Sequence, residues 1–212
     1  MTQPVVQPAA SATAPLTVKR ISLTGGIACG KSVVREILDS YNVPVIDADE
    51  LTAEVYQRDE ELKANIRDAF GADVFGDDGQ VDRKKLGNRV FSDTASLQRL
   101  AGWIHPKVAP QIQSFFESHN DQKLAVAVIP VLFEYGLEDE YDEIWVVKAT
   151  RDQQIVRLMT HRGFNREEAE ARINIQLPLP SKVVQADFVI DNSGALAQTR
   201  QQVQKKLQQM GW

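Results

Sequence analysis

The stretch from residue 25 to residue 32, Gly-Gly-Ile-Ala-Cys-Gly-Lys-Ser, constrains this chain more than any other part of it. It matches the pattern G-x-x-x-x-G-K-[ST] at every fixed position, and it lies between a short apolar run at residues 21–23 and a helix-like stretch at residues 31–40. A loop that leaves a strand and enters a helix directs successive backbone N–H groups and the positive helix end at one point. The sequence therefore predicts a strand, a phosphate-binding loop and a helix in this order.

Each side chain of this loop has an expected role. Gly25 and Gly30 let the backbone approach a phosphate group closely. Lys31 supplies a mobile positive charge for the β- and γ-phosphates, and the hydroxyl of Ser32 suits Mg²⁺. We expect the whole loop to contact a nucleoside triphosphate, through Gly25, Gly26, Ile27, Ala28, Cys29, Gly30, Lys31 and Ser32.

Length and charge narrow the class of protein further. The 212 residues suffice for one domain, or for one domain with a sizeable insertion. The net charge of −5 argues against broad, sequence-independent binding to nucleic acid, and no apolar run approaches the roughly 20 residues that span a bilayer. The single cysteine, Cys29, excludes an internal disulfide and fits a reducing compartment, so we expect a cytoplasmic location.

Apolar runs that are bounded by turn signals predict the core of the fold. Most of them lack polar alternation, as is typical of strands in a parallel sheet that is covered on both faces. The predicted strands are residues 20–24, 43–47, 124–129, 143–148 and 188–190. Helix-like segments separate them, at residues 31–40, several places in 50–118, 152–161 and 198–208. This alternation predicts a doubly wound α/β domain with a parallel five-stranded sheet.

Two segments do not belong to this regular alternation. The pattern of residues 50–120 predicts almost only helices and turns, although a crossover between parallel strands needs only about a dozen residues. We expect an inserted helical subdomain over the carboxyl edge of the sheet, where it could hold a second substrate. Residues 162–177 are polar and rich in arginine, with Gly163 as a hinge, which favours a small mobile lid. The nucleotide-binding core would then be residues 18–49 and 121–212, preceded by a disordered tail at residues 1–17.

Two aspartates end the second predicted strand, Asp47 and Asp49. One carboxylate could face the nucleotide site while the other holds the turn. A carboxylate near the transferred phosphate could accept the proton of an attacking hydroxyl, orient that hydroxyl, or contact Mg²⁺ through water. The alternative interpretation is that Asp49 caps a helix that begins at Glu50. From spacing alone the two interpretations of Asp49 have equal weight.

The lid arginines are expected partners of the phosphates. A guanidinium near the β,γ-bridge could stabilise the charge that develops on transfer, and we favour Arg162 for this role. Arg166 and Arg172 also fit an ordinary solvated helix with ion pairs between near neighbours. Beyond the last strand, Asn192 lies at the carboxyl edge of the sheet, where it suits contact with the adenine base.

Two further side chains have two open interpretations each. The helix end and Lys31 could lower the pKa of the Cys29 thiol and make it reactive, so that ATP would protect it from alkylation. Alternatively, Cys29 simply occupies a position for a small residue. Glu134 follows the third strand and could contact the substrate or a metal-bound water, but a surface carboxylate fits its position nearly as well.

Several motifs, in order from residue 21 almost to the end, resemble those of the dephospho-coenzyme A kinase family. The specific ones are the lead-in to the loop, the aspartate turn, the end of the third strand and parts of the insert and lid. They read Leu23-Thr24-Gly25-Gly26-Ile27, Val45-Ile46-Asp47-Ala48-Asp49, Asp78-Gly79-Gln80-Val81-Asp82-Arg83, Ile129-Pro130-Val131-Leu132-Phe133-Glu134, and Arg166-Glu167-Glu168-Ala169 with Arg172 and Gln176.

The resemblance implies a P-loop kinase with a nucleotide core, a helical coenzyme A-binding insert and a lid. The implied reaction is ATP-dependent phosphorylation of the ribose 3′-hydroxyl of dephospho-coenzyme A, with Mg²⁺ at Ser32 and Asp49 acting on the hydroxyl as a base or orienting group. A monomer or weak homo-oligomer is expected. Without the resemblance, a P-loop kinase of a nucleoside or nucleoside monophosphate is the alternative. A GTP-binding switch is disfavoured, because the guanine-reading Asn-Lys-x-Asp pattern is absent.

The chain departs from the family pattern in two places. Ala28 and Cys29 replace the usual Gly and Ser in the middle of the loop, and Ala28 is tolerable only if its position does not need a positive φ. An ungapped match also places His161 where the family usually has its catalytic arginine, with Arg162 next to it. We predict that Arg162 takes this role.

Overall fold

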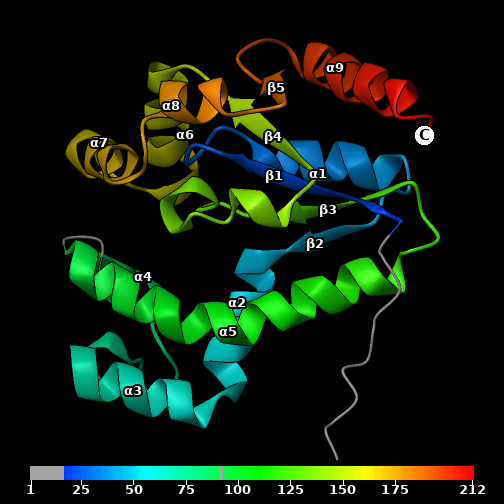
Figure 1. Cartoon of the computed structure of the whole chain (residues 1–212). Helices are drawn as coiled ribbons and strands as arrows, with labels where there is room; N and C mark the ends of the chain where they lie inside the picture. The colour runs from blue at the N-terminus through cyan, green and yellow to red at the C-terminus, as the bar shows by residue number, and fades with distance from the viewer. Residues whose placement is uncertain (1–16, 91–92) are drawn as a thin grey trace, which may run out of the picture.

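The computed structural model describes residues 17–90 and 93–212, so nearly all of the expected tail at residues 1–17 lies outside the described residues. Within them, five parallel strands form one sheet in the order β2-β3-β1-β4-β5 (Figure 1). Their bounds are β1 Lys19–Gly25, β2 Val45–Asp47, β3 Leu124–Val128, β4 Glu143–Lys148 and β5 Phe188–Asp191. The predicted α/β class and the parallel five-stranded sheet are confirmed.

The central strand β1 pairs with β3 on one side and with β4 on the other. The connections reverse direction here, so a crevice opens beyond the carboxyl end of β1, the usual ligand site of open α/β sheets. All five residues of β3 are buried, which explains its unbroken apolar run. The second strand begins at Val45 instead of the predicted residue 43, because the Val43 amide donates to Leu38 at the end of the preceding helix.

Helices cover both faces of the sheet, as doubly wound folds require. The helices α1 (Lys31–Ser40) and α9 (Leu196–Gln209) pack on one face through Ile37, Val203 and Leu207. The other face packs against α8 (Leu179–Val184) and the end of α5 (Thr94–Ser118). Two more helices, α6 (Arg151–Arg162) and α7 (Arg166–Ile175), lie near the loop that follows β1 (Figure 1). Of these helices, α8 was not predicted from the sequence.

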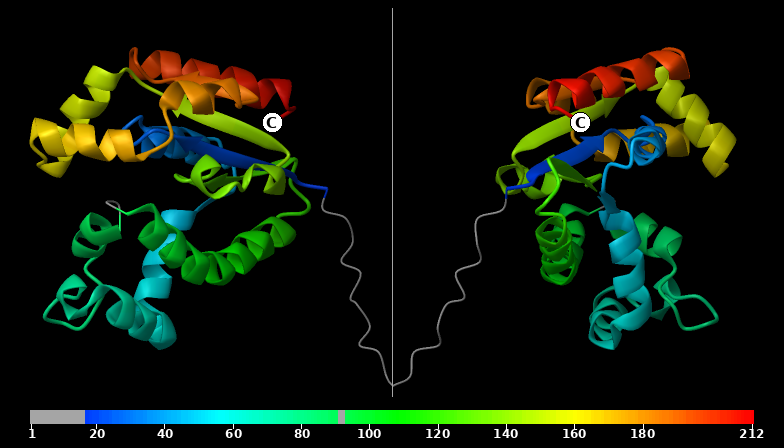
Figure 2. Two further views of the ribbon diagram at one scale, coloured as in Figure 1. Left: turned by 60° about the vertical axis from the view of Figure 1, so that its left-hand side comes forward. Right: turned by 90° about the vertical axis from the view of Figure 1, so that its right-hand side faces the viewer.

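The helical segment between β2 and β3 protrudes from the sheet (Figure 2). It consists of α2 (Ala48–Arg58), α3 (Glu60–Phe70), a short 3₁₀ turn η1 (Ala72–Val74), α4 (Arg83–Val90) and α5. It has an apolar core of its own, to which Leu62, Ile66 and Leu86 contribute buried side chains. Two further 3₁₀ turns follow β3, η2 (Phe133–Tyr135) and η3 (Glu138–Glu140).

Across residues 17–90 and 93–212, no helix combines the length and the hydropathy that membrane crossing requires.

Candidate active site

The loop after β1 has a backbone that only glycine allows at two positions. Gly25 has φ 142°, and a Cβ atom there would lie 2.3 Å from the carbonyl oxygen of Val147. Gly30 has φ 100°, and its Cβ atom would lie 2.0 Å from Nδ2 of Asn192. Both approaches are far below van der Waals contact. The two glycines that the motif requires therefore let the loop sit directly against β4 and the end of β5.

The backbone conformation of Ala28 differs from the one expected from the sequence. Its φ is 57°, so the position adopts the left-handed region, and the expectation that a tolerated Ala28 would avoid positive φ is wrong. An alanine in this region costs on the order of 1 kcal/mol relative to its usual conformations. Contacts from α6 offset that cost, since Nη1 of Arg157 donates to the carbonyl oxygen of Ala28 at 3.1 Å.

The helix α6 braces the loop with two side chains that sequence analysis missed. Nε2 of Gln154 donates to the Ile27 carbonyl at 2.7 Å, and Arg157 donates to the Cys29 carbonyl at 3.2 Å as well as to that of Ala28. From the lid side, Oε1 of Gln176 accepts the Ile27 amide at 2.7 Å. The 3-residue spacing of Gln154 and Arg157 places them on one face of the helix. This spacing alone does not indicate contact with the loop, because it does not show which face of α6 packs there.

Asn192 ties β5 to the same loop. Its side chain is buried, and Nδ2 donates to the Cys29 carbonyl at 2.9 Å while Oδ1 accepts from the hydroxyl of Thr199. Asn192 lines the nucleotide cavity described below, but both ends of its carboxamide already have protein partners. Contact between Asn192 and the adenine base stays a prediction.

Lys31 lies at the start of α1 with its ammonium folded back on the loop. Nζ donates to the carbonyl oxygens of Gly25 at 3.3 Å and Gly26 at 3.1 Å. Burial holds the pKa of Lys31 below its usual range, because a desolvated ammonium is poorly stabilised without an anion. The hydroxyl of the next residue, Ser32, is exposed in the same cavity. The ammonium of Lys31 and the hydroxyl of Ser32 therefore both lie beside the loop, and their contacts with phosphate and metal stay predictions.

The two aspartates after β2 have different environments. Asp47 is the N-cap of α2: Oδ1 accepts the Asp49 amide at 2.8 Å, and Oδ2 accepts from Nη1 of Arg35 at 3.4 Å. Desolvation raises the pKa of Asp47 above its usual value. Because α2 begins at Ala48, the alternative interpretation of Asp49 as the helix cap is wrong. Asp49 lies in the first turn of α2 with an exposed carboxylate.

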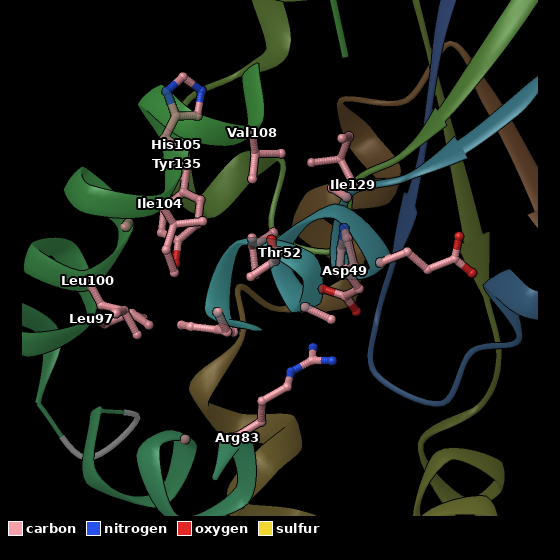
Figure 3. A pocket seen from close by; sticks show the side chains of 18 of the residues that line it. Asp49, Thr52, Arg83, Leu97, Leu100, Ile104, His105, Val108, Ile129 and Tyr135 are labelled. Atoms are coloured by element: carbon pink, nitrogen blue, oxygen red, sulfur yellow. The ribbon is translucent and has the colours of Figure 1, made fainter. Parts of the chain in front are cut away.

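Two cavities meet at this carboxylate. The first, the nucleotide cavity, measures about 800 Å³ and is lined by the loop, the start of α1, Arg157 and Asn192. The second, the acceptor cavity, measures about 790 Å³ and lies between α2, α4, α5 and the segment after β3 (Figure 3). The residues that line both are Asp49, Arg83, Leu97, Pro130, Val131 and Arg162. Two ligands, one in each cavity, would therefore come together beside Asp49 and Arg162.

The structure separates the lid arginines. Arg162 is the last residue of α6, before Gly163 with φ 68°, and it lines both cavities, whereas His161 lines the nucleotide cavity alone. Arg166 pairs with Glu170 at 3.3 Å on the surface. Arg172 donates to Oδ1 of Asn88 at 2.7 Å, lies 4.2 Å from the centroid of the Phe164 ring, and lines the acceptor cavity.

Glu134 lies inside the nucleotide cavity, so its interpretation as a surface carboxylate is wrong. Its Oε1 lies 2.6 Å from Nζ of Lys182, a fully buried lysine of α8, and accepts the Leu177 amide at 3.0 Å. Glu134 thus joins Leu177 and α8 to the segment after β3. Sequence analysis missed Lys182, because no local pattern marks a lysine whose partner is 48 residues earlier in the chain.

Cys29 is fully buried, and this reverses one expectation about it. Burial raises the pKa of its thiol, and this outweighs the opposing effects of Lys31 and Arg157, so the idea of a lowered pKa is wrong. Because the thiolate is the reactive form, we expect maleimide to label native Cys29 orders of magnitude more slowly than the unfolded chain at pH 8, with ATP making little difference. Fast labelling of the native protein that ATP blocks would contradict this.

Comparison with known proteins agrees with this geometry. The model of the family described as dephospho-CoA kinase matches residues 19–198. A dephospho-CoA kinase of Carboxydothermus hydrogenoformans is 41% identical over 194 residues, which are 91% of this chain and 94% of the relative. The solved structure of TT1252 from Thermus thermophilus is 33% identical, with a TM-score of 0.77 over 91% of this chain and 97% of its own.

A dephospho-CoA kinase from Campylobacter jejuni has also been solved. It is 28% identical and has a TM-score of 0.64, over 90% of this chain and 96% of its own. The match to residues 19–198 thus covers the loop after β1, the helical segment and residues 162–177 together. This chain belongs to the dephospho-CoA kinase family.

Proposed function

We propose that this protein transfers the γ-phosphoryl group of ATP to the ribose 3′-hydroxyl of dephospho-coenzyme A. The products would be coenzyme A and ADP, in the final step of coenzyme A biosynthesis. The observation that carries this proposal is the meeting of two large cavities at Asp49 and Arg162, with the phosphate-binding loop on one side only. We also propose a cytoplasmic location and a monomer or weak homo-oligomer.

Different residues would bind ATP, accept the proton of the acceptor and stabilise the transferred phosphoryl group. The loop amides and Lys31 would bind the phosphates of ATP, in an environment that favours an anion because the ammonium is desolvated. The acceptor would lie in the cavity against the helical segment, with its 3′-hydroxyl next to Asp49. A bond forms between the 3′-oxygen and the γ-phosphorus, the bond to the β,γ-bridging oxygen breaks, and Asp49 takes the hydroxyl proton. Arg162 would stabilise the charge on the phosphoryl oxygens.

Oxygen donors in the nucleotide cavity fit Mg²⁺, which prefers such ligands and shares them with substrate phosphates. The Ser32 hydroxyl is exposed there, and Oε2 of Glu134 is buried without a hydrogen-bond partner among the described residues. We propose that Ser32 holds the ion and that Glu134 faces its water shell. When bound, Mg²⁺ would neutralise charge on the β- and γ-phosphates.

The size of the acceptor cavity favours dephospho-coenzyme A over a bare nucleoside. At about 790 Å³ it matches the nucleotide cavity, and much of its wall is the apolar side of α5. A nucleoside or nucleoside monophosphate would leave most of that wall without contact. A long acceptor with an extended arm would contact that apolar wall.

A panel of acceptors tests the proposal. ADP release from Mg-ATP is measured with dephospho-coenzyme A, adenosine, AMP and no acceptor, at equal enzyme concentrations. We expect release to depend on dephospho-coenzyme A, with kcat/KM far above that for the two smaller acceptors. A higher kcat/KM with adenosine or AMP would preserve the fold and the loop but contradict the assigned substrate.

A further inference from the structure

The basic side chains of the acceptor cavity differ in whether they already have partners within the protein. Arg172 is engaged by Asn88 and the Phe164 ring. Among residues 17–90 and 93–212, Arg83, Lys84 and Arg162 have neither a hydrogen-bond nor an ion-pair partner for their side chains. Cations that line a cavity without protein partners are where an anionic ligand group gains most, since no existing contact must break.

Arg83 is nevertheless held in place by its backbone. It is the first residue of α4, and the residue before it, Asp82, accepts the amides of Lys84 at 2.9 Å and Lys85 at 3.0 Å. Upstream, Val81 pairs with Phe75 in an antiparallel bridge, and one turn later Leu86 is buried in the core of the helical segment. A free guanidinium therefore projects from a rigid start of helix.

The position of Arg83 along the acceptor cavity sets what it can reach. It lines both cavities, together with Asp49 and Arg162. Figure 3 shows its guanidinium extended toward the turn that carries Asp49, on the side of the cavity away from His105. Farther along, α5 presents an apolar wall made of Leu97, Leu100, Ile104 and Val108. The cavity thus offers a carboxylate and a cation where it meets the nucleotide cavity, and an apolar surface beyond them.

We propose that Arg83 binds the 5′-diphosphate of the acceptor and thereby selects dephospho-coenzyme A, an inference that rests on the function proposed above. The acceptor has the matching order of groups: a ribose hydroxyl, a diphosphate and a long uncharged arm. The planar guanidinium can donate two parallel hydrogen bonds to phosphate oxygens, and Lys84 adds a second positive charge beside it. A nucleoside has no diphosphate, so Arg83 contributes nothing to its binding.

Calorimetric binding to three purified proteins tests this assignment. Dephospho-coenzyme A and a non-hydrolysable ATP analogue are titrated separately into the wild type, Arg83→Met and Arg83→Lys. Arg83→Met should raise the Kd of dephospho-coenzyme A roughly 10- to 100-fold, the size expected when hydrogen bonds to a charged group are lost. The Kd of dephospho-coenzyme A for Arg83→Lys should lie between the values for the wild type and Arg83→Met, because lysine keeps the positive charge but cannot donate two parallel hydrogen bonds. The Kd of the ATP analogue should stay within about twofold.

A matched variant controls for the change in net charge. Arg58→Met removes the same charge from the same helical segment, at a side chain that is 80% exposed and lines neither cavity. It should leave both Kd values unchanged, and thermal unfolding checks that each variant is folded.

Two outcomes would overturn the role of Arg83. One is an unchanged Kd of dephospho-coenzyme A in Arg83→Met, and the other is a rise confined to the ATP analogue, which would place Arg83 at the γ-phosphate. Failure of the proposed function gives a different result: the wild type would bind dephospho-coenzyme A without phosphorylating it.

Discussion

Replacing Asp49 with Asn is expected to lower kcat for phosphorylation of dephospho-coenzyme A by roughly 10²- to 10⁴-fold, the usual contribution of a positioned acid–base group. Asn keeps the size of the side chain but cannot take the proton of the 3′-hydroxyl. Because Asp47, and not Asp49, caps α2, the substitution removes no helix cap. The Kd of ATP, measured by calorimetry, should therefore stay within about twofold while steady-state kinetics show the loss in kcat.

Glu54→Gln is the matched control for this prediction. Glu54 lies on the same helix, pairs with Arg58 on the surface and lines neither cavity. The substitution Glu54→Gln removes the same charge as Asp49→Asn and should leave kcat unchanged. If Asp49→Asn lowered kcat only slightly, and to the same extent as ATP binding, Asp49 would have no role in the proton transfer.

Replacing Lys31 with Ala is expected to damage both ATP binding and turnover. Loss of a single preorganised donor to a transition-state charge costs roughly 10²- to 10³-fold in kcat, and the Kd of ATP should rise at least tenfold, because Lys31 is expected to contact the phosphates in the ground state as well. Kinetics with dephospho-coenzyme A give the first value, and calorimetry with a non-hydrolysable analogue gives the second.

Folding should survive this substitution. The folded protein lowers the pKa of Lys31, which means that its charged form is less favoured there than in the unfolded chain. Removing the ammonium therefore loses two hydrogen bonds to carbonyls but also a desolvated charge, and the Tm of the ligand-free protein should change by less than about 3 °C. Normal ATP affinity of the variant would contradict the role given to Lys31, and a variant that does not fold would contradict the small expected change in Tm.

The parts of the fold that sequence analysis predicted correctly depend on local signals. The helix α1 has the predicted bounds, because Gly30 permits the turn that starts it and its apolar residues face the sheet. The strand β3 and the middle of β4 are continuous apolar runs that end in turns, as buried parallel strands do, and β1 contributes the buried Ile21 and Leu23 between short hydroxyl side chains. In the candidate site, the sequence points to Asp49 and Arg162, and both lie where the two cavities meet; their roles stay predictions.

What sequence analysis missed depends on contacts between distant segments. Asp47 and Asp49 are equally good caps by residue type, and the bond from Arg35 on α1 helps to hold Asp47 in that position. Gln154 lies 127 residues from the carbonyl that it braces. Cys29 has the neighbours that usually activate a thiol, but packing against the sheet buries it, and desolvation outweighs their charge. None of these outcomes can be read from a window of neighbouring residues.

The central claim concerns where the phosphoryl group goes, so the most direct measurement identifies the product. Dephospho-coenzyme A is incubated with Mg-ATP and the protein, and the product is examined by mass spectrometry and ³¹P NMR. The account predicts coenzyme A, with one new phosphomonoester on the ribose 3′-oxygen for each ADP released. ADP release with unmodified dephospho-coenzyme A, or a phosphate at another position, would contradict it.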